Sequence, residues 1–309
     1  MNNNKIAIST HNLTKNFENR VAVHNLNIEI KQGEIFSLLG TNGAGKTTTI
    51  KMLCCLLQAT SGNATVMGFD IRSNSLNIKK NIGVSPQETA IAEHLTTKEN
   101  LLLMGGIFGM KKAEAKLRAN KLMELMELED RKDQSRKLSG GMQRRLSIAM
   151  ALMPDPQILF LDEPTLGLDP HARKSVWNYI EKLKPEKTIL LTTHYLEEAD
   201  ALSDHMAIMD EGNVIEMGTS SELKKKYTSR QTLRITGENI NDDIIKILNR
   251  QELTTNLFQN GIEISAIQPD IYSIIDILRQ HDVKISGIEM KEPSLDDIFL
   301  HLTDKETKK

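Results

Sequence analysis

The sequence is poor in aromatic residues and cysteine, and it has no long apolar run. Aromatics make up only 4% of the 309 residues, so the core must be built from aliphatic side chains. The two cysteines, Cys54 and Cys55, are adjacent and cannot easily bridge each other, which is typical of a reducing compartment. The longest apolar stretch, residues 101–110, is half the length of about 20 residues that a membrane-spanning helix needs. We therefore expect a cytosolic chain with neither a signal peptide nor a membrane span.

No single sign of charge dominates either. The 39 Lys and Arg residues face 41 Asp and Glu residues, for a net charge of −2, which argues against a surface built to coat nucleic acid. With 39% hydrophobic and 26% charged residues, the chain can bury a core and is not disordered as a whole. The length predicts roughly two domains.

Up to about Gly218, short apolar runs alternate with helical stretches, which predicts an α/β domain. Residues 35–39, 158–161 and 188–193 are apolar on both faces, as expected of strands covered on both sides. Residues 206–210 and 214–217 flank a turn and predict a hairpin.

Between about residues 88 and 153 the pattern is helical instead. A stripe of leucines falls near a 3.6-residue spacing, with two methionines beside it that we interpret as packing residues. These residues are Leu117, Leu122, Leu125 and Leu128, with Met123 and Met126.

The last 80 residues predict a small domain of a different kind. A short charged helix or linker, residues 221–226, precedes a strand, a helix, two strands, a helix, a strand and a closing helix. Their predicted ranges are 232–236, 242–249, 254–259, 262–267, 270–280, 283–290 and 295–303. The βαββαβ order suggests a ferredoxin-like α+β domain. Ser294 and Asp297 form a plausible capping pair for the closing helix.

The clearest chemical motif is a phosphate-binding loop. Residues 40–47 match G-x-x-x-x-G-K-[ST] between an apolar strand and a helix, which argues against an incidental glycine-rich turn. Glycines let backbone N–H groups turn toward phosphate oxygens, and a helix N-terminus adds partial positive charge. Lys46 places a cation on the β- and γ-phosphates, and the Thr47 hydroxyl is a hard ligand for Mg²⁺.

Two carboxylates end another apolar strand. Asp162 suits Mg²⁺, directly or through water, and Glu163 suits a general base that polarises a water molecule. Alone, a strand-end carboxylate often only caps a turn, but the phosphate loop favours the catalytic interpretation. His194 also ends a strand, where a lone histidine is usually structural, although it could place an imidazole beside the γ-phosphate. Gln87 by itself gives almost no indication of a function.

A further segment brings a family resemblance. Residues 138–144 (LSGGMQR) resemble the signature sequence of ABC transporter ATPases. The phosphate loop, Gln87, this signature, Asp162-Glu163, residues 167–169 and His194 appear in that family's order. The resemblance covers about residues 5–220. It implies a P-loop NTPase fold, an ABC-type nucleotide-binding domain at 1–225 with a helical subdomain at about 88–153, followed by an accessory or regulatory domain at 226–309.

The resemblance also implies a role at the ATP site for each of several residues. Phe17 would stack on adenine, with Val23 beside that surface. Gln87 would reach Mg²⁺ or the attacking water, Glu163 would be the catalytic carboxylate, and His194 would contact the γ-phosphate. The phosphate-loop residues that would hold the nucleotide are Asn42, Gly43, Ala44, Gly45, Lys46, Thr47 and Thr48, and the Mg²⁺ ligands would be Thr47, Gln87 and Asp162.

In that family two nucleotide-binding domains sandwich two ATP molecules head to tail. Ser139, Gly140 and Gly141 would cap the ATP held by a second domain, in a homodimer or a heterodimer, and Asp169 would couple the two sites. Met142 stands where glutamine is usual, but Ser139, Gly140 and Gly141 are intact, so we expect catalysis to survive.

The C-terminal segment indicates which group of ABC ATPases the chain resembles. Residues 292–303 are similar to the closing motif of type-2 ABC exporter ATPases, although the amphipathic helix there could also simply dock on its own domain. The implied protein is the Mg-dependent ATPase subunit of an exporter of a drug, antibiotic, peptide or lipid-like compound. It would lie on the inner face of the membrane and act through a separate transmembrane permease.

The alternative is a soluble ABC ATPase acting on ribosomes or DNA. The chain offers one nucleotide domain and no room for a long coiled-coil insertion between Lys46 and Ser139, so this interpretation is disfavoured.

Overall fold

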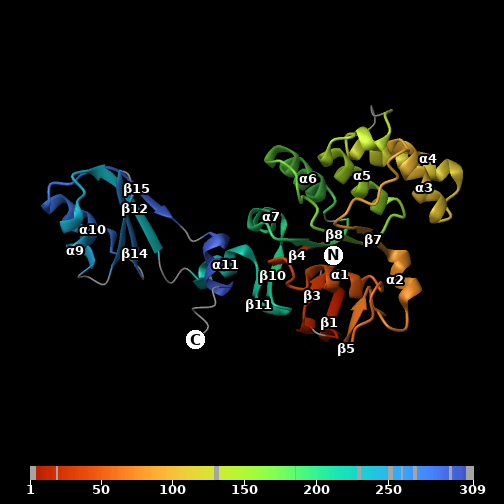
Figure 1. The fold of residues 1–309 in the computed structure, drawn as a ribbon, viewed down its shortest axis with the longest axis horizontal. Helices are drawn as coiled ribbons and strands as arrows, with labels where there is room; N and C mark the ends of the chain where they lie inside the picture. The colour runs from red at the N-terminus through yellow and green to blue at the C-terminus, as the bar shows by residue number, and fades with distance from the viewer. Residues whose placement is uncertain are drawn as a thin grey trace. The chain divides into compact units, whose positions relative to one another are not determined.

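The computed structural model of the chain describes residues 5–18, 20–128, 132–184, 186–227, 231–249, 253–258, 260–266, 270–291 and 294–303. They belong to two units, Met1–Thr219 and Ser220–Lys309 (Figure 1). The boundary expected after residue 225 falls within helix α8 (Ser220–Tyr227), which the structure groups with the second unit. Gln259, Ile267, Glu292 and Pro293, which we placed at strand ends and in the closing motif, lie outside the described residues.

A six-stranded sheet organises the first unit, in the order β11-β10-β4-β9-β8-β7. Neighbouring strands from β10 to β7 are parallel, and β11 pairs antiparallel with β10. The three predicted strands and the hairpin are confirmed. The strands are β4 (Ile35–Gly40), β7 (Ile82–Ser85), β8 (Ile158–Asp162), β9 (Thr188–Thr193), β10 (His205–Asp210) and β11 (Asn213–Gly218).

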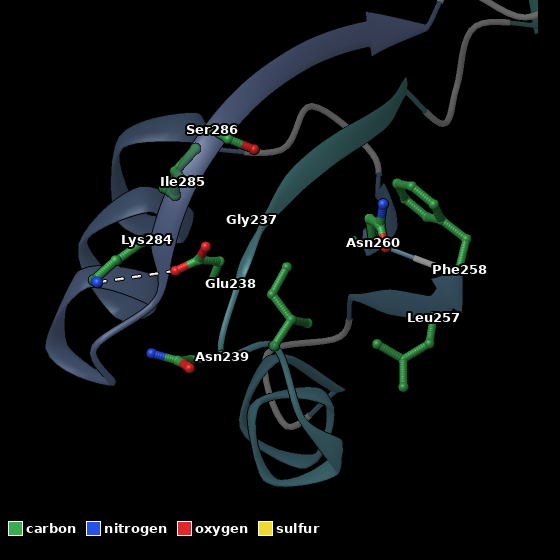
Figure 2. A pocket seen from close by; sticks show the side chains of 11 residues that line it. Gly237, Glu238, Asn239, Leu257, Phe258, Asn260, Lys284, Ile285 and Ser286 are labelled. Atoms are coloured by element: carbon green, nitrogen blue, oxygen red, sulfur yellow. Dashed lines mark ion pairs between the residues drawn. The ribbon is translucent and has the colours of Figure 1, made fainter.

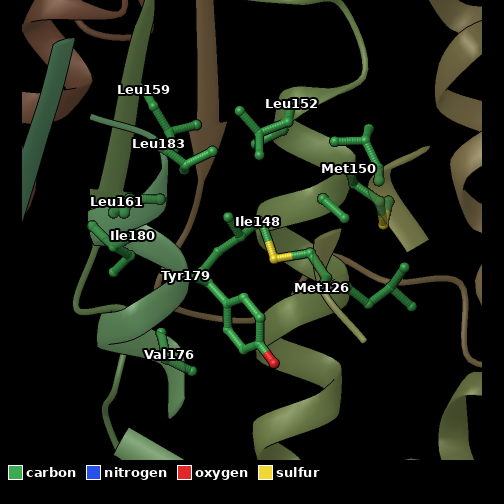
Figure 3. Packing of buried hydrophobic residues seen from close by; sticks show 14 of the residues in the cluster. Met126, Ile148, Met150, Leu152, Leu159, Leu161, Val176, Tyr179, Ile180 and Leu183 are labelled. Atoms are coloured by element: carbon green, nitrogen blue, oxygen red, sulfur yellow. The ribbon is translucent and has the colours of Figure 1, made fainter. Parts of the chain in front are cut away.

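Both faces of this sheet are covered, which explains why its central strands are apolar throughout. Leu159 and Leu161 pack with α5 and α6 on one face, as Figure 3 shows, whereas Ile158 and Phe160 belong to the core on the other face. The helices of this unit are α1 (Lys46–Leu53), α2 (Ser75–Asn81), α3 (Thr97–Ile107), α4 (Lys112–Leu125), the 3₁₀ turn η1 (Ser135–Lys137), α5 (Gly140–Leu152), α6 (Pro170–Lys182) and α7 (Leu196–Leu202).

A second, antiparallel sheet covers the other face together with α1, and the sequence analysis did not anticipate it. Its order is β2-β1-β5-β6, with β3 paired to β1. The polar residues of β1 hide the alternation that predicts a half-buried strand. The strands are β1 (Ile6–Phe17), β2 (Arg20–Leu26), β3 (Glu29–Lys31), β5 (Ser61–Val66) and β6 (Phe69–Asp70).

The expected leucine stripe is wrong at Leu117, whose side chain is 74% exposed. The buried face of α4 instead begins at Ala115, because α3 and α4 approach closely there. A Cβ added to Gly105 of α3 would lie only 2.8 Å from the Ala115 Cβ, so this crossing has no room for leucine. Met123 and Met126 are buried, which confirms them as packing residues.

The second unit contains the four-stranded antiparallel sheet β13-β14-β12-β15. This strand order is that of the predicted ferredoxin-like βαββαβ unit. Its core joins Leu233 and Ile235 to Ile274 and Leu278 of α10. The elements are β12 (Gln231–Glu238), α9 (Asp242–Asn249), β13 (Thr254–Phe258), β14 (Gly261–Ala266), α10 (Ile271–Gln280), β15 (Lys284–Lys291) and α11 (Leu295–Thr303).

Two short helices, α8 and α11, complete this unit. Ser294 and Asp297 cap the start of α11 reciprocally, because the Ser294 N–H donates to Asp297 Oδ2 at 2.9 Å and the Asp297 N–H donates to Ser294 Oγ at 3.2 Å. The predicted capping pair is therefore confirmed. Across the described residues of both units, no helix has the length and apolar character needed to cross a membrane.

Candidate active site

Four loops meet at one edge of the parallel sheet, because each follows the carboxyl end of a strand. The phosphate loop follows β4, Gln87 follows β7, Asp162 and Glu163 end β8, and His194 follows β9. In open α/β sheets this edge is where ligands bind. The fold therefore gathers residues that lie more than 100 positions apart in the sequence.

The phosphate loop leads directly into α1, whose first residue is Lys46. Gly43 and Gly45 adopt φ angles of 87° and 104°, a left-handed conformation that favours glycine. Lys46 Nζ donates to the backbone oxygens of Gly40 and Thr41 at 2.8 and 3.1 Å. Burial lowers the pKa of Lys46, and the neighbouring carboxylates Glu163 and Asp162 oppose that shift. The loop and the helix N-terminus form a preorganised anion site.

Glu163 is held between two basic side chains. Its Oε1 lies 3.4 Å from Lys46 Nζ, and its Oε2 lies 2.9 Å from His194 Nδ1. The backbone of Glu163 has a φ of 47°, and its N–H donates to both the carbonyl and the hydroxyl oxygen of Thr192. Such a backbone conformation costs about 1–3 kcal/mol in a non-glycine residue, and the surrounding contacts must maintain it. Glu163 is buried, so its carboxylate has a fixed position.

Beside this pair lies a cluster of oxygen atoms. Thr47 Oγ1 donates to Asp162 Oδ1 at 3.0 Å, and Thr192 Oγ1 donates to the same atom at 2.6 Å. A hydroxyl and a carboxylate at this separation are the hard oxygen donors that Mg²⁺ prefers. The residues present therefore fit a magnesium ion at the mouth of the phosphate loop. The sequence analysis placed Thr192 only in the strand at residues 188–193 and gave it no role at the site, although a threonine inside an otherwise apolar run could have suggested one.

Gln87 is held at this edge of the sheet by a hydrogen bond to its backbone carbonyl oxygen. Arg144 of α5 donates from Nη2 to the Gln87 carbonyl oxygen at 2.7 Å. Arg144 is buried, and sequence analysis singled it out only as part of the signature.

The expected adenine surface lies at the hairpin of β1 and β2. Phe17 ends β1 with its side chain 48% exposed, and Lys15 Nζ lies 5.1 Å from the ring centroid. Val23 of β2 is fully buried beneath the phosphate loop, where its Cγ2 would lie 3.2 Å from a Cβ at Gly45. Ala44 is likewise buried, with its N–H bonded to the Thr41 oxygen at 3.2 Å. Asn42 is exposed at the tip of the loop, and Thr48 is half-buried in α1.

The signature residues form a separate group at the start of α5. Ser139 caps this helix by accepting from the Met142 N–H, and Gly140 and Gly141 are its first residues. A Cβ at Gly141 would lie 3.2 Å from Ala172 Cβ of α6. Asp169 caps α6 by accepting from the His171 and Ala172 N–H groups, each at 3.0 Å, and these bonds lower its pKa. Helices α5 and α6 therefore begin side by side.

A buried carboxylate of α7, Glu198, supports the segment after Glu163. Glu198 Oε1 accepts from Thr165 Oγ1 at 2.8 Å and from Trp177 Nε1 at 2.9 Å. Burial raises the pKa of Glu198, and these hydrogen bonds oppose the shift only in part. No sequence pattern distinguishes it from the exposed Glu197 beside it.

The second unit holds a cavity of about 760 Å³ at the end of its sheet. Figure 2 shows that it is lined by the end of β12, the β13–β14 hairpin and the start of β15. Lys284 and Glu238 lie on its rim, 3.9 Å apart and mostly exposed. These two side chains carry opposite charges, so together they add no net charge to the rim.

Comparisons with known proteins match both units. Residues 23–166 match a family described as ABC transporter, and residues 218–303 match the family of the DrrA1-3-like ATP-binding protein C-terminal domain. The linearmycin resistance ATP-binding protein LnrL of Bacillus subtilis is 34% identical, over 96% of this chain and 98% of that protein. The daunorubicin/doxorubicin resistance ATP-binding protein DrrA of Streptomyces peucetius is 37% identical, over 96% and 92%.

A third relative and a solved structure are also similar to this chain. The Nod factor export ATP-binding protein I of Rhizobium sp. is 36% identical over 99% of both chains. Among solved structures, the dimeric bacterial ABC transporter cassette MJ0796 has a TM-score of 0.63 and 28% identity, over 69% of this chain and 98% of that one. The same cassette has also been solved as a dimer bound to ADP and phosphate.

Proposed function

The chain belongs to the family of ABC transporter ATP-binding proteins, and from this premise we propose that it powers the export of a drug, antibiotic, peptide or lipid-like compound through a separate membrane subunit. The observation that carries the proposal is similarity to resistance and export ATP-binding proteins over nearly the whole chain, including the C-terminal domain. As an ABC ATPase, the chain binds ATP. The roles of individual residues below are part of the proposal.

ATP binds with its adenine on Phe17 and its phosphates in the loop at residues 42–48. The exposed Phe17 ring offers a flat stacking face, and the nearby Lys15 adds a cation beside it. Backbone N–H groups and the N-terminus of α1 hold the β- and γ-phosphates, with Lys46 as a point charge.

Thr47, Asp162 and Gln87 would hold Mg²⁺. The ion neutralises phosphate charge when bound. The Thr192 hydroxyl, bonded to Asp162 Oδ1 at 2.6 Å, fixes the orientation of that carboxylate. Asp162 would therefore present its oxygens to the ion without reorganisation.

Hydrolysis requires a base beside the γ-phosphate, and Glu163 fills this role. Glu163 accepts a proton from the attacking water while water oxygen bonds to the γ-phosphorus and ADP departs. His194, 2.9 Å from Oε2, and Lys46, 3.4 Å from Oε1, keep the carboxylate aimed at that water. The positive φ of Glu163 is consistent with strain retained for this geometry.

A second nucleotide-binding domain completes the site. Ser139, Gly140 and Gly141 present a hydroxyl and free N–H groups at the start of α5, where a helix N-terminus favours anions. They face the γ-phosphate of ATP held by the partner domain, and Asp169 lies on the same surface. The solved dimers of the MJ0796 cassette support this assembly.

The membrane subunit docks on the helical region after Gln87. Leu103, Ile107 and Phe108 at the end of α3 are exposed, by 47%, 67% and 44% of their surface. Exposed apolar side chains grouped on one helix are a typical protein contact. The chain thereby lies at the inner face of the membrane. Because two of its relatives are named as drug or antibiotic resistance proteins, we propose a cargo of that class.

Replacement of Glu163 by glutamine tests the proposal. Glu163→Gln keeps the shape and loses the base, so we expect ATP turnover to fall by about 10²–10⁴ while ATP binding survives. Glu197→Gln is the matched control, because Glu197 is 78% exposed on α7. With the membrane subunit co-expressed, the wild type and the control should protect cells from a drug such as daunorubicin, and Glu163→Gln should not. Full turnover by Glu163→Gln, or equal protection by all three, contradicts the proposal.

A further inference from the structure

Helix α5 runs along strand β7 in the direction opposite to the strand, and contacts join them at regular intervals. A Cβ at Gly83 would lie 2.2 Å from the Ala151 oxygen, so the two backbones meet closely at that point. Two residues further along the strand, Ser85 Oγ lies 2.8 Å from Ser147 Oγ, and both side chains are buried. Positions 151 and 147 are one helical turn apart, so they lie on one face of α5.

The next position on that face is Arg144, which reaches the loop after β7. Its Nη1 donates to the Pro86 oxygen and its Nη2 donates to the Gln87 oxygen, both at 2.7 Å. Arg144 is only 4% exposed, so water cannot readily replace either bond. The planar fork of a guanidinium can hold two successive carbonyls at once, whereas a lysine ammonium cannot fix both in one plane.

The environment of Arg144 keeps this contact strong. Burial lowers its pKa, and the charges of Asp162, Glu198 and Glu163 oppose that shift. Arginine stays protonated in proteins, so both bonds to the loop are charge-assisted. The guanidinium therefore feels the charges of these carboxylates while it hydrogen-bonds the backbone of the Gln87 loop.

We infer that Arg144 is a positioning residue for Gln87, and that it makes the Gln87 loop and the signature end of α5 move as one body. The inference rests on the proposed function, in which Gln87 contacts the metal or the attacking water. Ser139 lies at the start of the same helix. A displacement of the loop is therefore carried to the residues that cap the partner's ATP.

The chain supplies a matched control one residue away. Arg145 is half-buried on the same helix α5, but its Nη1 donates to the Met126 oxygen at 3.0 Å and to Tyr179 Oη at 3.2 Å. It touches neither β7 nor the Gln87 loop in the contacts described. Arg145→Lys therefore removes a guanidinium from the same helix without releasing Gln87.

The experiment measures ATP hydrolysis by the purified full chain at varied ATP and Mg²⁺. Misplacement of a catalytic group by about 1 Å costs about 10²-fold, so we expect Arg144→Lys to lower kcat by about tenfold to hundredfold. The KM for ATP should change little, and the Mg²⁺ concentration for half-maximal turnover should rise. Arg145→Lys should leave kcat and the Mg²⁺ dependence near the wild-type values. Equal effects of the two variants overturn the inference.

A double-mutant cycle with Gln87→Ala separates positioning from stability. If Arg144 acts through the Gln87 side chain, Arg144→Lys should lower kcat by no more than about twofold in the Gln87→Ala background, because the two effects are then not additive. A loss of folded protein would instead lower activity equally in both backgrounds, and that additive result contradicts the inference. Wild-type turnover, measured in parallel, reports on the proposed function alone: a wild type that does not hydrolyse ATP contradicts that function.

Discussion

Replacing Gly45 by alanine pushes a methyl group into the backbone of β2. The new Cβ would lie 2.3 Å from the Ala22 oxygen and 3.2 Å from Val23 Cγ2, at a residue whose φ is 104°. The Ala22 contact is with backbone, which cannot rotate away. Gly43 offers a matched comparison in the same loop, because its φ is 87° but nothing lies within 4 Å of its added Cβ.

The two substitutions therefore separate steric cost from conformational cost. Alanine in a left-handed conformation costs about 1–2 kcal/mol, and this applies to both positions. At Gly45 the strand must also retreat by about 1 Å, and overpacking of this kind costs about 1–3 kcal/mol more. We expect Gly43→Ala to lose about 1–2 kcal/mol of unfolding free energy and Gly45→Ala about 2–5 kcal/mol.

Urea unfolding followed by tryptophan fluorescence measures this difference. Trp177 is the single tryptophan and lies in α6, so the signal reports on the first unit. Binding of a fluorescent ATP analogue to the folded variants gives a second readout, and Gly45→Ala should bind more weakly by about tenfold or more, since it displaces the loop. Equal losses at the two glycines would refute the reasoning that β2 fixes the loop.

Three further substitutions test separate parts of the account. His194→Ala should lower kcat by about tenfold to hundredfold in a phosphate-release assay, because one hydrogen bond to a charged group contributes about 1.5–3 kcal/mol; an unchanged kcat contradicts the role of His194 at Glu163. Burial raises the pKa of Glu198, so its contribution to stability is complete below the unfolded pKa and is lost as pH rises through the folded pKa. Glu198→Gln should therefore show a smaller fall in unfolding free energy as the pH rises from the unfolded pKa of Glu198 to its folded pKa, and an identical fall would exclude Glu198 as the source. Thr96→Ala removes the capping box with Glu99 at the start of α3 and should cost about 1 kcal/mol in urea unfolding, whereas no loss contradicts that contact.

Strands and helices with a strong periodic pattern could be predicted from the sequence almost to the residue. Strand β9 and helices α9 and α11 have the predicted bounds, because burial on both faces or on one helical stripe leaves a clear pattern. The antiparallel sheet of β1, β2 and β5 left no such pattern. Its strands mix threonine, asparagine and histidine with apolar residues, and only their tertiary partners reveal which face is buried.

The residues of the candidate site also fall into those that the sequence predicts and those that it does not. The phosphate loop and Asp162-Glu163 were predictable because their chemistry requires particular residues in a local order. Arg144, Thr192 and Glu198 were not, since each acts across a long separation in sequence. Two arginines with different tertiary partners look alike in a sequence, as Arg144 and Arg145 demonstrate.

The central claim is that ATP joins two nucleotide-binding domains and that Glu163 then hydrolyses it. The most direct measurement is the molar mass of the Glu163→Gln chain by size-exclusion chromatography with light scattering, with ATP and Mg²⁺ or with ADP and Mg²⁺. The account predicts a dimer that retains two ATP molecules in the first condition and a monomer in the second. A chain that stays monomeric with bound ATP, or a Glu163→Gln chain that converts ATP to ADP at the wild-type rate, would contradict it.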